Sequence, residues 1–188
     1  YTEELATRAA QPAYAWSPDG HWLIHLRLDE AGVQDHSVTD YRTVPPTLSY
    51  TRYPTAGTAN PLPTLYLIDL ATGQSTPLPL PGDAEYVLPF FTWFPDSQEA
   101  VYVIVNREHT KLELLAYDVL SGTGRSILQE TDPAWVNENS YTAPLFLGDG
   151  GQFLWLSERD GFMHLYLYSR QGGLLRQVTQ GEWMIDTP

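Results

Sequence analysis

The stretch Trp16-Ser17-Pro18-Asp19-Gly20-His21-Trp22-Leu23-Ile24-His25-Leu26-Arg27-Leu28 decides the fold, because it predicts two apolar strands joined by a tight turn. Pro18 fixes a φ suited to a turn, Asp19 can cap that turn with its carboxylate, and Gly20 permits a positive φ. The pattern recurs as Trp93-Phe94-Pro95-Asp96-Ser97 and, with less similarity, as Phe146-Leu147-Gly148-Asp149-Gly150, each followed by an apolar run. The chain therefore contains three copies of one strand–turn–strand unit.

Each copy continues into two further strands joined by a glycine-containing turn. We expect these strand pairs at residues 64–70 and 75–80, at 112–119 and 125–129, and at 163–169 and 174–179. Four antiparallel strands in a repeat of about 40–50 residues are typical of a β-propeller blade. The sequence predicts an all-β fold of about three four-stranded antiparallel blades from a β-propeller. A β-sandwich is the alternative, but it does not require the same order of strands and turns three times.

The repeat also predicts how the chain is divided. We expect one blade over residues 1–80, a second over 81–133, a third over 134–181, and the start of a further blade over 182–188. The interval 29–63 is too long for an ordinary connection of about 4–6 residues. It is rich in proline but contains a strand-like run at 47–53, so it predicts a protruding two-stranded arm. Residues 1–10 are rich in Ala, Leu and Glu and predict a short helix.

Composition excludes several classes of protein. The formal net charge of −13 over 188 residues disfavours binding to nucleic acid or to an anionic membrane surface. The absence of cysteine excludes disulfides and thiolate chemistry. No apolar run reaches the roughly 20 residues that cross a bilayer, so we expect a soluble protein without a membrane segment. Because the chain begins at Tyr1 and ends at Pro188 within a repeat, we expect a piece of a longer protein.

Few residues are candidates for chemistry. No G-x-S-x-G nucleophile elbow is present, so no catalytic residue is predicted within this piece. His21 and His25 are four residues apart, which suits a metal on a helix but not in a strand, and no metal or cofactor is predicted. The other candidates are interpreted as surface, packing or turn residues: His36, His109, His164, Asp19, Asp96 and Asp149. On composition alone, Glu3-Glu4 is a solvated helix start.

Several segments of the chain carry a resemblance to a known family. The more specific ones are Tyr1-Thr2-Glu3-Glu4-Leu5 and Arg52-Tyr53-Pro54-Thr55-Ala56-Gly57-Thr58-Ala59-Asn60-Pro61. The others are Asp40-Tyr41-Arg42, Thr131-Asp132-Pro133-Ala134-Trp135-Val136 and Trp155-Leu156-Ser157-Glu158-Arg159-Asp160-Gly161. Together they resemble the propeller domain of dipeptidyl peptidase IV, in the prolyl oligopeptidase family, and are similar to its bacterial members. The resemblance covers essentially the whole chain.

The resemblance implies a fold and a function. The family has an eight-bladed propeller joined to an α/β-hydrolase domain, and this chain would supply about three blades. The parent protein would be a serine exopeptidase that releases Xaa-Pro or Xaa-Ala dipeptides from free peptide amino termini, without a cofactor. Glu3 and Glu4 would bind the substrate's amino terminus. Some relatives have a Phe and an Arg after the Trp-Val pair in an extended subsite, but this chain has Asn137-Glu138-Asn139-Ser140-Tyr141 there.

The arm implies a further partner, because the family dimerises through such an extension and Tyr and Arg are enriched in interface hot spots. We expect a homodimer in which the arm contributes Tyr41, Arg42, Tyr50, Arg52 and Tyr53. The resemblance also suggests the bacterial cytoplasm or periplasm. Two other functions stay open: a non-catalytic propeller scaffold for protein interaction, and a related acylaminoacyl peptidase or oligopeptidase. The latter would not need a carboxylate pair for an ammonium group.

Overall fold

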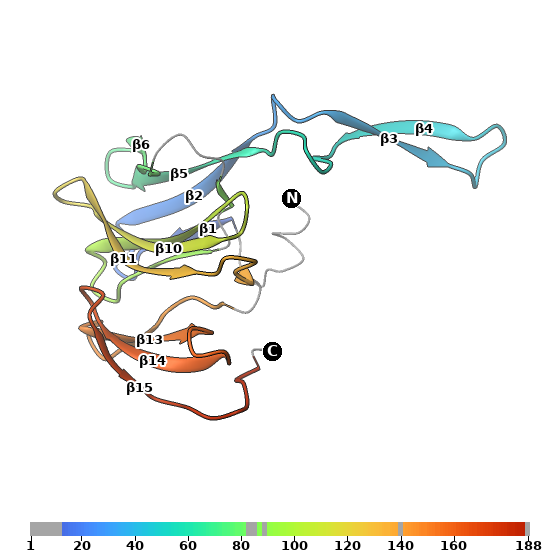
Figure 1. The fold of residues 1–188 in the computed structure, drawn as a ribbon. Coiled ribbons are helices and arrows are strands. Elements are labelled where there is room, and N and C mark those ends of the chain that lie inside the picture. The colour runs from blue at the N-terminus through green and yellow to red at the C-terminus, as the bar shows by residue number, and fades with distance from the viewer. Residues whose placement is uncertain (1–12, 82–85, 88–89, 139–140, 187–188) are drawn as a thin grey trace.

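The structure is a computed structural model that describes residues 13–81, 86–87, 90–138 and 141–186. These residues form three antiparallel sheets stacked face to face and a separate two-stranded hairpin that projects from the stack (Figure 1). No α-helix is present in these ranges, and therefore none long and apolar enough to cross a membrane. The predicted helix over residues 1–10 lies outside the described residues.

The first sheet has the order β1-β2-β5-β6, as a propeller blade requires. Its strands are Tyr14–Trp16, Trp22–Asp29, Leu62–Asp69 and Ser75–Pro77. The arm is inserted between its second and third strands and consists of β3 (Asp35–Asp40) and β4 (Thr47–Arg52). The structure thus has a two-stranded hairpin within the interval 29–63.

The second sheet contains β8 (Phe91–Trp93), β9 (Glu99–Asn106), β10 (Lys111–Asp118) and β11 (Thr123–Thr131). A short additional strand, β7 (Tyr86–Val87), also pairs with β9. Almost every residue of β9 and β10 is buried, because this sheet has a neighbour on each face. Alternate residues of a strand point to opposite faces, so one strand can supply side chains to two cores.

The third sheet has the order β12-β13-β14-β15. Its strands are Leu145–Leu147, Gln152–Ser157, His164–Ser169 and Leu174–Gln177. With the other two sheets it confirms the predicted all-β fold of three propeller blades. The start of a further blade is expected over 182–188, and the described part of that segment, residues 182–186, is not a strand; a backbone hydrogen bond joins the Ile185 N–H to the Met163 carbonyl at 2.9 Å. A strand needs a full ladder with a neighbour, and no described strand lies beyond this segment.

Two apolar cores hold the sheets together, one at each boundary. Tyr102 and Ile104 of β9 point into the core shared with the first sheet, whereas Val103 and Val105 point into the core shared with the third. The largest fully buried side chains include Trp155, Tyr102 and Phe94. Burial of such side chains contributes about 1.5–3 kcal/mol each, so the stacking of blades is the main stabilising interaction.

Candidate functional site

The three strand–turn–strand copies form the same turn in all three sheets. In each turn, the carbonyl of the residue before the Pro-Asp or Gly-Asp pair accepts a hydrogen bond from the N–H three residues later in the chain. The donor and acceptor residues are Gly20 and Ser17 at 2.9 Å, Ser97 and Phe94 at 3.0 Å, and Gly150 and Leu147 at 3.0 Å. The turn aspartates Asp19, Asp96 and Asp149 each accept from the N–H two residues on, at 3.0, 3.1 and 3.0 Å. The interpretation of these aspartates as turn residues is confirmed.

Ser97 occupies the turn position at which the other two copies have Gly20 and Gly150. Its φ of 63° is a value that glycine adopts more readily. However, its hydroxyl accepts a 3.0 Å hydrogen bond from the N–H of Asp19 and so joins the first and second sheets. The side chain of Asp19 accepts a hydrogen bond from the Ser17 hydroxyl at 2.6 Å. This bond has the largest effect on the pKa of Asp19, the hydrogen bond from the His21 N–H has the next largest, and together they lower that pKa to about 2.

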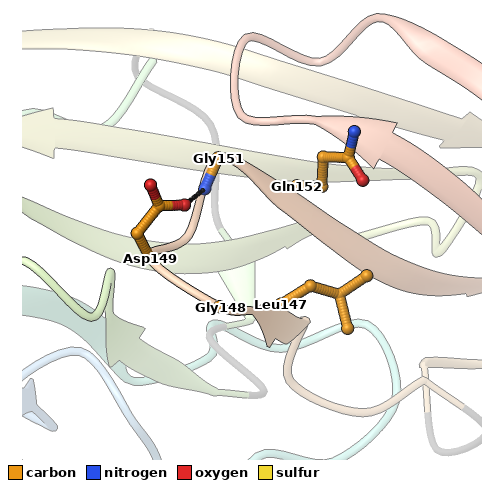
Figure 2. Close-up of a pocket in the computed structure, with 5 residues that line it drawn as sticks. All are labelled: Leu147, Gly148, Asp149, Gly151 and Gln152. Carbon is orange, nitrogen blue, oxygen red and sulfur yellow. Dashed lines mark hydrogen bonds between the residues drawn. The ribbon is translucent and has the colours of Figure 1, made fainter.

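Figure 2 shows the equivalent turn of the third sheet, which lines a shallow surface hollow. The lining residues are Leu147, Gly148, Asp149, Gly151 and Gln152. Asp149, the one ionisable group among them, accepts the hydrogen bond from Gly151 that closes the turn. This hollow therefore belongs to the turn and offers no convergent polar groups to a ligand.

Because the sheets are antiparallel meanders, their connections gather at two opposite ends. The tight turns described above lie at one end. At the other lie the arm and the connections 107–110, 132–138 and 158–163, and we call this the crossover end. The arm projects from it (Figure 1). β1 begins at the crossover end with Tyr14. Glu3 and Glu4 lie outside the described residues.

A buried carboxylate organises the crossover end between the second and third sheets. Glu130, at the end of β11, accepts hydrogen bonds from Trp155 Nε1 at 3.1 Å, from the Ser157 hydroxyl at 2.9 Å and from an Arg159 guanidinium nitrogen at 2.6 Å. The Arg159 guanidinium also lies over the Tyr166 ring, 4.8 Å from its centroid. Three donors compensate the burial of this charge, which would otherwise be costly.

A second polar cluster joins the connections 107–110 and 132–138. The His109 ring stacks on Trp135, with centroids 4.1 Å apart and planes 6° from parallel. Its Nδ1 lies 2.9 Å from Oε2 of Glu138, whose side chain is almost fully buried. Hydrogen bonds from the N–H groups of Trp135 and Ala134 lower the pKa of Asp132. His109 is a packing residue, as one interpretation allowed, but its partner Glu138 is 29 residues away and no local pattern indicates it.

The remaining histidines do not converge. The Nδ1 atom of His21 lies 3.0 Å from Oδ2 of Asp19. The His25 ring stacks on Tyr66 with ring centroids 5.3 Å apart, and the ring centroids of His36 and Tyr53 are 6.1 Å apart. Buried His164 bonds to Thr179 and to the carbonyl of Gly181. The described ranges contain no group of three or more His, Asp or Glu residues that could hold a metal ion.

The arm residues predicted to form an interface are mostly solvent-exposed. Tyr41 and Tyr50 are 78% and 69% exposed, and Tyr53 is 54% exposed. Arg42 pairs with Asp40 at 2.8 Å near the tip, and Arg52 donates to the Glu30 carbonyl at 3.1 Å at the foot of the arm. The structure thus places these five side chains along one hairpin, where a partner could contact them.

The stacked, repeated four-stranded sheets define this chain as part of a β-propeller. The model of the dipeptidyl peptidase IV (DPP IV) N-terminal region matches residues 1–188. The chain belongs to this family.

Individual relatives agree with this assignment. A protein named "Probable dipeptidyl peptidase 4" from Neosartorya fischeri is 30% identical over 184 residues, which is 90% of this chain and 24% of that protein. Dipeptidyl peptidase 4 from Trichophyton equinum is 26% identical over 184 residues, or 90% of this chain and 23% of that one. The crystal structure of Porphyromonas gingivalis dipeptidyl peptidase 4 matches with a TM-score of 0.85 and 28% identity, over 93% of this chain and 25% of that one. The chain thus spans about a quarter of the length of these relatives.

Proposed function

We propose that this chain is the part of a dipeptidyl peptidase IV-type serine exopeptidase that binds the free amino terminus of the peptide substrate. The observation that carries the proposal is the family match over all 188 residues together with the Glu3-Glu4 pair just upstream of β1. Xaa-Pro or Xaa-Ala dipeptides would be released by an α/β-hydrolase domain of the same polypeptide. The chain itself has no G-x-S-x-G nucleophile elbow.

Two adjacent carboxylates suit this role for an electrostatic reason. Carboxylates held close together repel each other, and a cation between them relieves the repulsion. An α-ammonium group supplies that cation and three hydrogen-bond donors, and charge-assisted hydrogen bonds are stronger than neutral ones. A fixed amino terminus would also fix the distance to the catalytic serine, so that two residues precede the cleaved bond.

Kinetics of the full-length protein with a Gly-Pro chromogenic substrate test the proposal. Removing one partner from a buried charged contact costs about 2–5 kcal/mol, so Glu3→Gln or Glu4→Gln should lower kcat/KM at least about thirtyfold. Asp35→Asn, which alters an exposed carboxylate of the arm, is the matched control and should leave kcat/KM unchanged. The amino-terminally acetylated substrate should be cleaved poorly by the wild type. Equal turnover of free and acetylated peptides would contradict the proposal.

Three further features of the parent protein belong to the same proposal. The division into blades at 1–80, 81–133 and 134–181, with 182–188 starting the next, follows the repeat in the sequence. A homodimer formed through the arm is supported by the exposure of its tyrosines. The resemblance to bacterial members supports a soluble protein of the bacterial cytoplasm or periplasm.

A further inference from the structure

The arm projects away from the stacked sheets (Figure 1), and it has no apolar core of its own. Every residue of β4 is exposed, and those of β3 are exposed or half-buried. A two-stranded hairpin by itself is at best marginally stable in water. The direction of the arm therefore depends on the two segments that join it to the first sheet, residues 30–34 and 53–61, which together form the foot of the arm.

The foot contains two turns that hold its shape. In the first segment, the N–H of Val33 donates to the Glu30 carbonyl at 3.0 Å, and Val33 is buried. In the second segment, the N–H and the hydroxyl of Thr58 both donate to the Thr55 carbonyl, at 3.0 and 2.8 Å. The Arg52 guanidinium connects the hairpin to the first turn by donating to the Glu30 carbonyl at 3.1 Å. These bonds lie within the arm and its foot, so they set the shape of the foot and not its direction relative to the sheets.

A side chain of the second sheet joins the foot to the stacked blades. Arg107, in the turn after β9, donates from its guanidinium to the carbonyl of Thr58, and this contact is partly buried. Hydrogen bonds from a charged donor are roughly twice as strong as neutral ones. The turn that carries Arg107 is itself held, because the side chain of Asn106 accepts from the N–H groups of Thr110 and Lys111 at 2.9 and 2.8 Å. Arg107 thus connects the foot of the arm to a fixed point of the neighbouring blade.

We propose that Arg107 is a positioning residue for the homodimer: it fixes the direction of the arm, so that Tyr41 and Tyr50 meet a second copy of the chain in a preformed arrangement. This inference rests on the homodimer of the proposed function. Ordering a loose element upon association costs free energy, and an element that is already ordered avoids that cost. In a two-fold dimer both arms carry the contact, so the effect of losing it is counted twice.

The first test compares the dimer dissociation constants of full-length variants by sedimentation. Arg107→Met retains an unbranched apolar stem but removes the donor, and it should raise the dissociation constant at least about tenfold. Arg107→Lys keeps a charged donor and should give a value closer to that of the wild type. Lys111→Met is the matched control, because it removes the same charge from the same β9–β10 hairpin, where the Lys111 ammonium pairs with Glu113 at 3.0 Å. It should leave the dissociation constant unchanged.

Hydrogen–deuterium exchange distinguishes a positioning role from a direct contact between Arg107 and the partner. It is measured on the full-length wild type and on Arg107→Met, both diluted until the dimer has dissociated. The amides of Tyr53 and Thr58 should exchange at least about fivefold faster in the variant, because each donates to a carbonyl of the foot that Arg107 no longer holds. Exchange in the buried strand β10 should be the same in both proteins.

The outcomes separate this inference from the proposed homodimer. A wild type that is monomeric, or a dimer that survives removal of the hairpin, would overturn both. An arm-dependent dimer with an unchanged dissociation constant in Arg107→Met would overturn the positioning role alone. A raised dissociation constant with unchanged exchange at Tyr53 and Thr58 would overturn it as well, because Arg107 would then act by direct contact with the partner. Thermal melting identifies variants that fail to fold; if Arg107→Met does not fold, Arg107→Gln, which shortens the side chain but keeps it polar, decides the question.

Discussion

Arg170 and Glu99 form an ion pair across the boundary between the second and third sheets, with Nε donating to Oε2 at 2.7 Å. Arg125 contacts the other oxygen of the same carboxylate at 2.8 Å, and Arg170 also pairs with Asp96. The Arg170 guanidinium lies 4.2 Å from the centroid of the buried Phe94 ring. The turn after β14 is thus joined to the first hairpin of the preceding blade, at the end opposite the arm.

Replacing Arg170 should destabilise the propeller. Arg170→Met removes the guanidinium but retains an apolar stem over Phe94, and it leaves Glu99, 10% exposed in its side chain, with one partner fewer. We expect a loss of about 3 kcal/mol in the free energy of unfolding, measured by urea denaturation of the full-length protein. Together with Glu99→Gln and the double variant, Arg170→Met completes a double-mutant cycle. We expect this cycle to give a coupling energy of about 1–3 kcal/mol between Arg170 and Glu99. Additive single-variant effects would show that the pair is not coupled.

Gly172 lies in the same turn and should not tolerate a side chain. Its φ is 89°, and a Cβ atom there would lie 1.8 Å from the Ile127 carbonyl oxygen of β11. Gly172→Ala should therefore cost the strain of a positive φ plus that of overpacking, about 3 kcal/mol together. Gly122, in the equivalent turn of the second sheet, has a φ of 70° and ordinary contacts only, so Gly122→Ala should cost about 1 kcal/mol. Thermal melting compares the two, and equal losses would contradict the close approach.

The sequence predicted the local features of this fold and missed the distant contacts. Pro18-Asp19-Gly20 and its two copies indicated the strands because turn chemistry is local, and the prolines of 29–63 indicated the arm. Ion pairs such as Arg170 with Glu99, 71 residues apart, depend on how the sheets stack, which no local pattern encodes. The same holds for His109 and Glu138. Glu3 and Glu4 were identified through resemblance and remain a prediction.

Acidification should remove a contribution of Asp19 to stability. The pKa of Asp19 is lowered in the folded protein from 3.8 to about 2, chiefly by the hydrogen bond from Ser17. A carboxyl group whose folded-state pKa is depressed stabilises the fold above its unfolded pKa and loses that effect as pH falls through the folded value. The wild type should therefore melt at a higher temperature than Asp19→Asn above about pH 4, and the difference should diminish towards about pH 2. A difference independent of pH in calorimetry of the full-length protein would contradict this linkage.

If the arm forms the proposed homodimer interface, removing it should convert the full-length protein from dimer to monomer. The N–H of Tyr53 donates to the carbonyl of Gln34 at 3.2 Å, so the two ends of the hairpin meet, and residues 35–52 can be replaced by a short Gly-Ser turn without disturbing the first sheet. Exposed Tyr41 and Tyr50 are the side chains most available to a partner. Interface hot spots contribute about 2 kcal/mol or more each, so the Tyr41→Ala, Tyr50→Ala variant should weaken dimerisation at least about a hundredfold. Sedimentation of the full-length protein measures the dimer dissociation constant. Ser49→Ala, on the same strand β4 as Tyr50, is the control and should leave that constant unchanged. A dimer that survives removal of the hairpin would place the interface elsewhere.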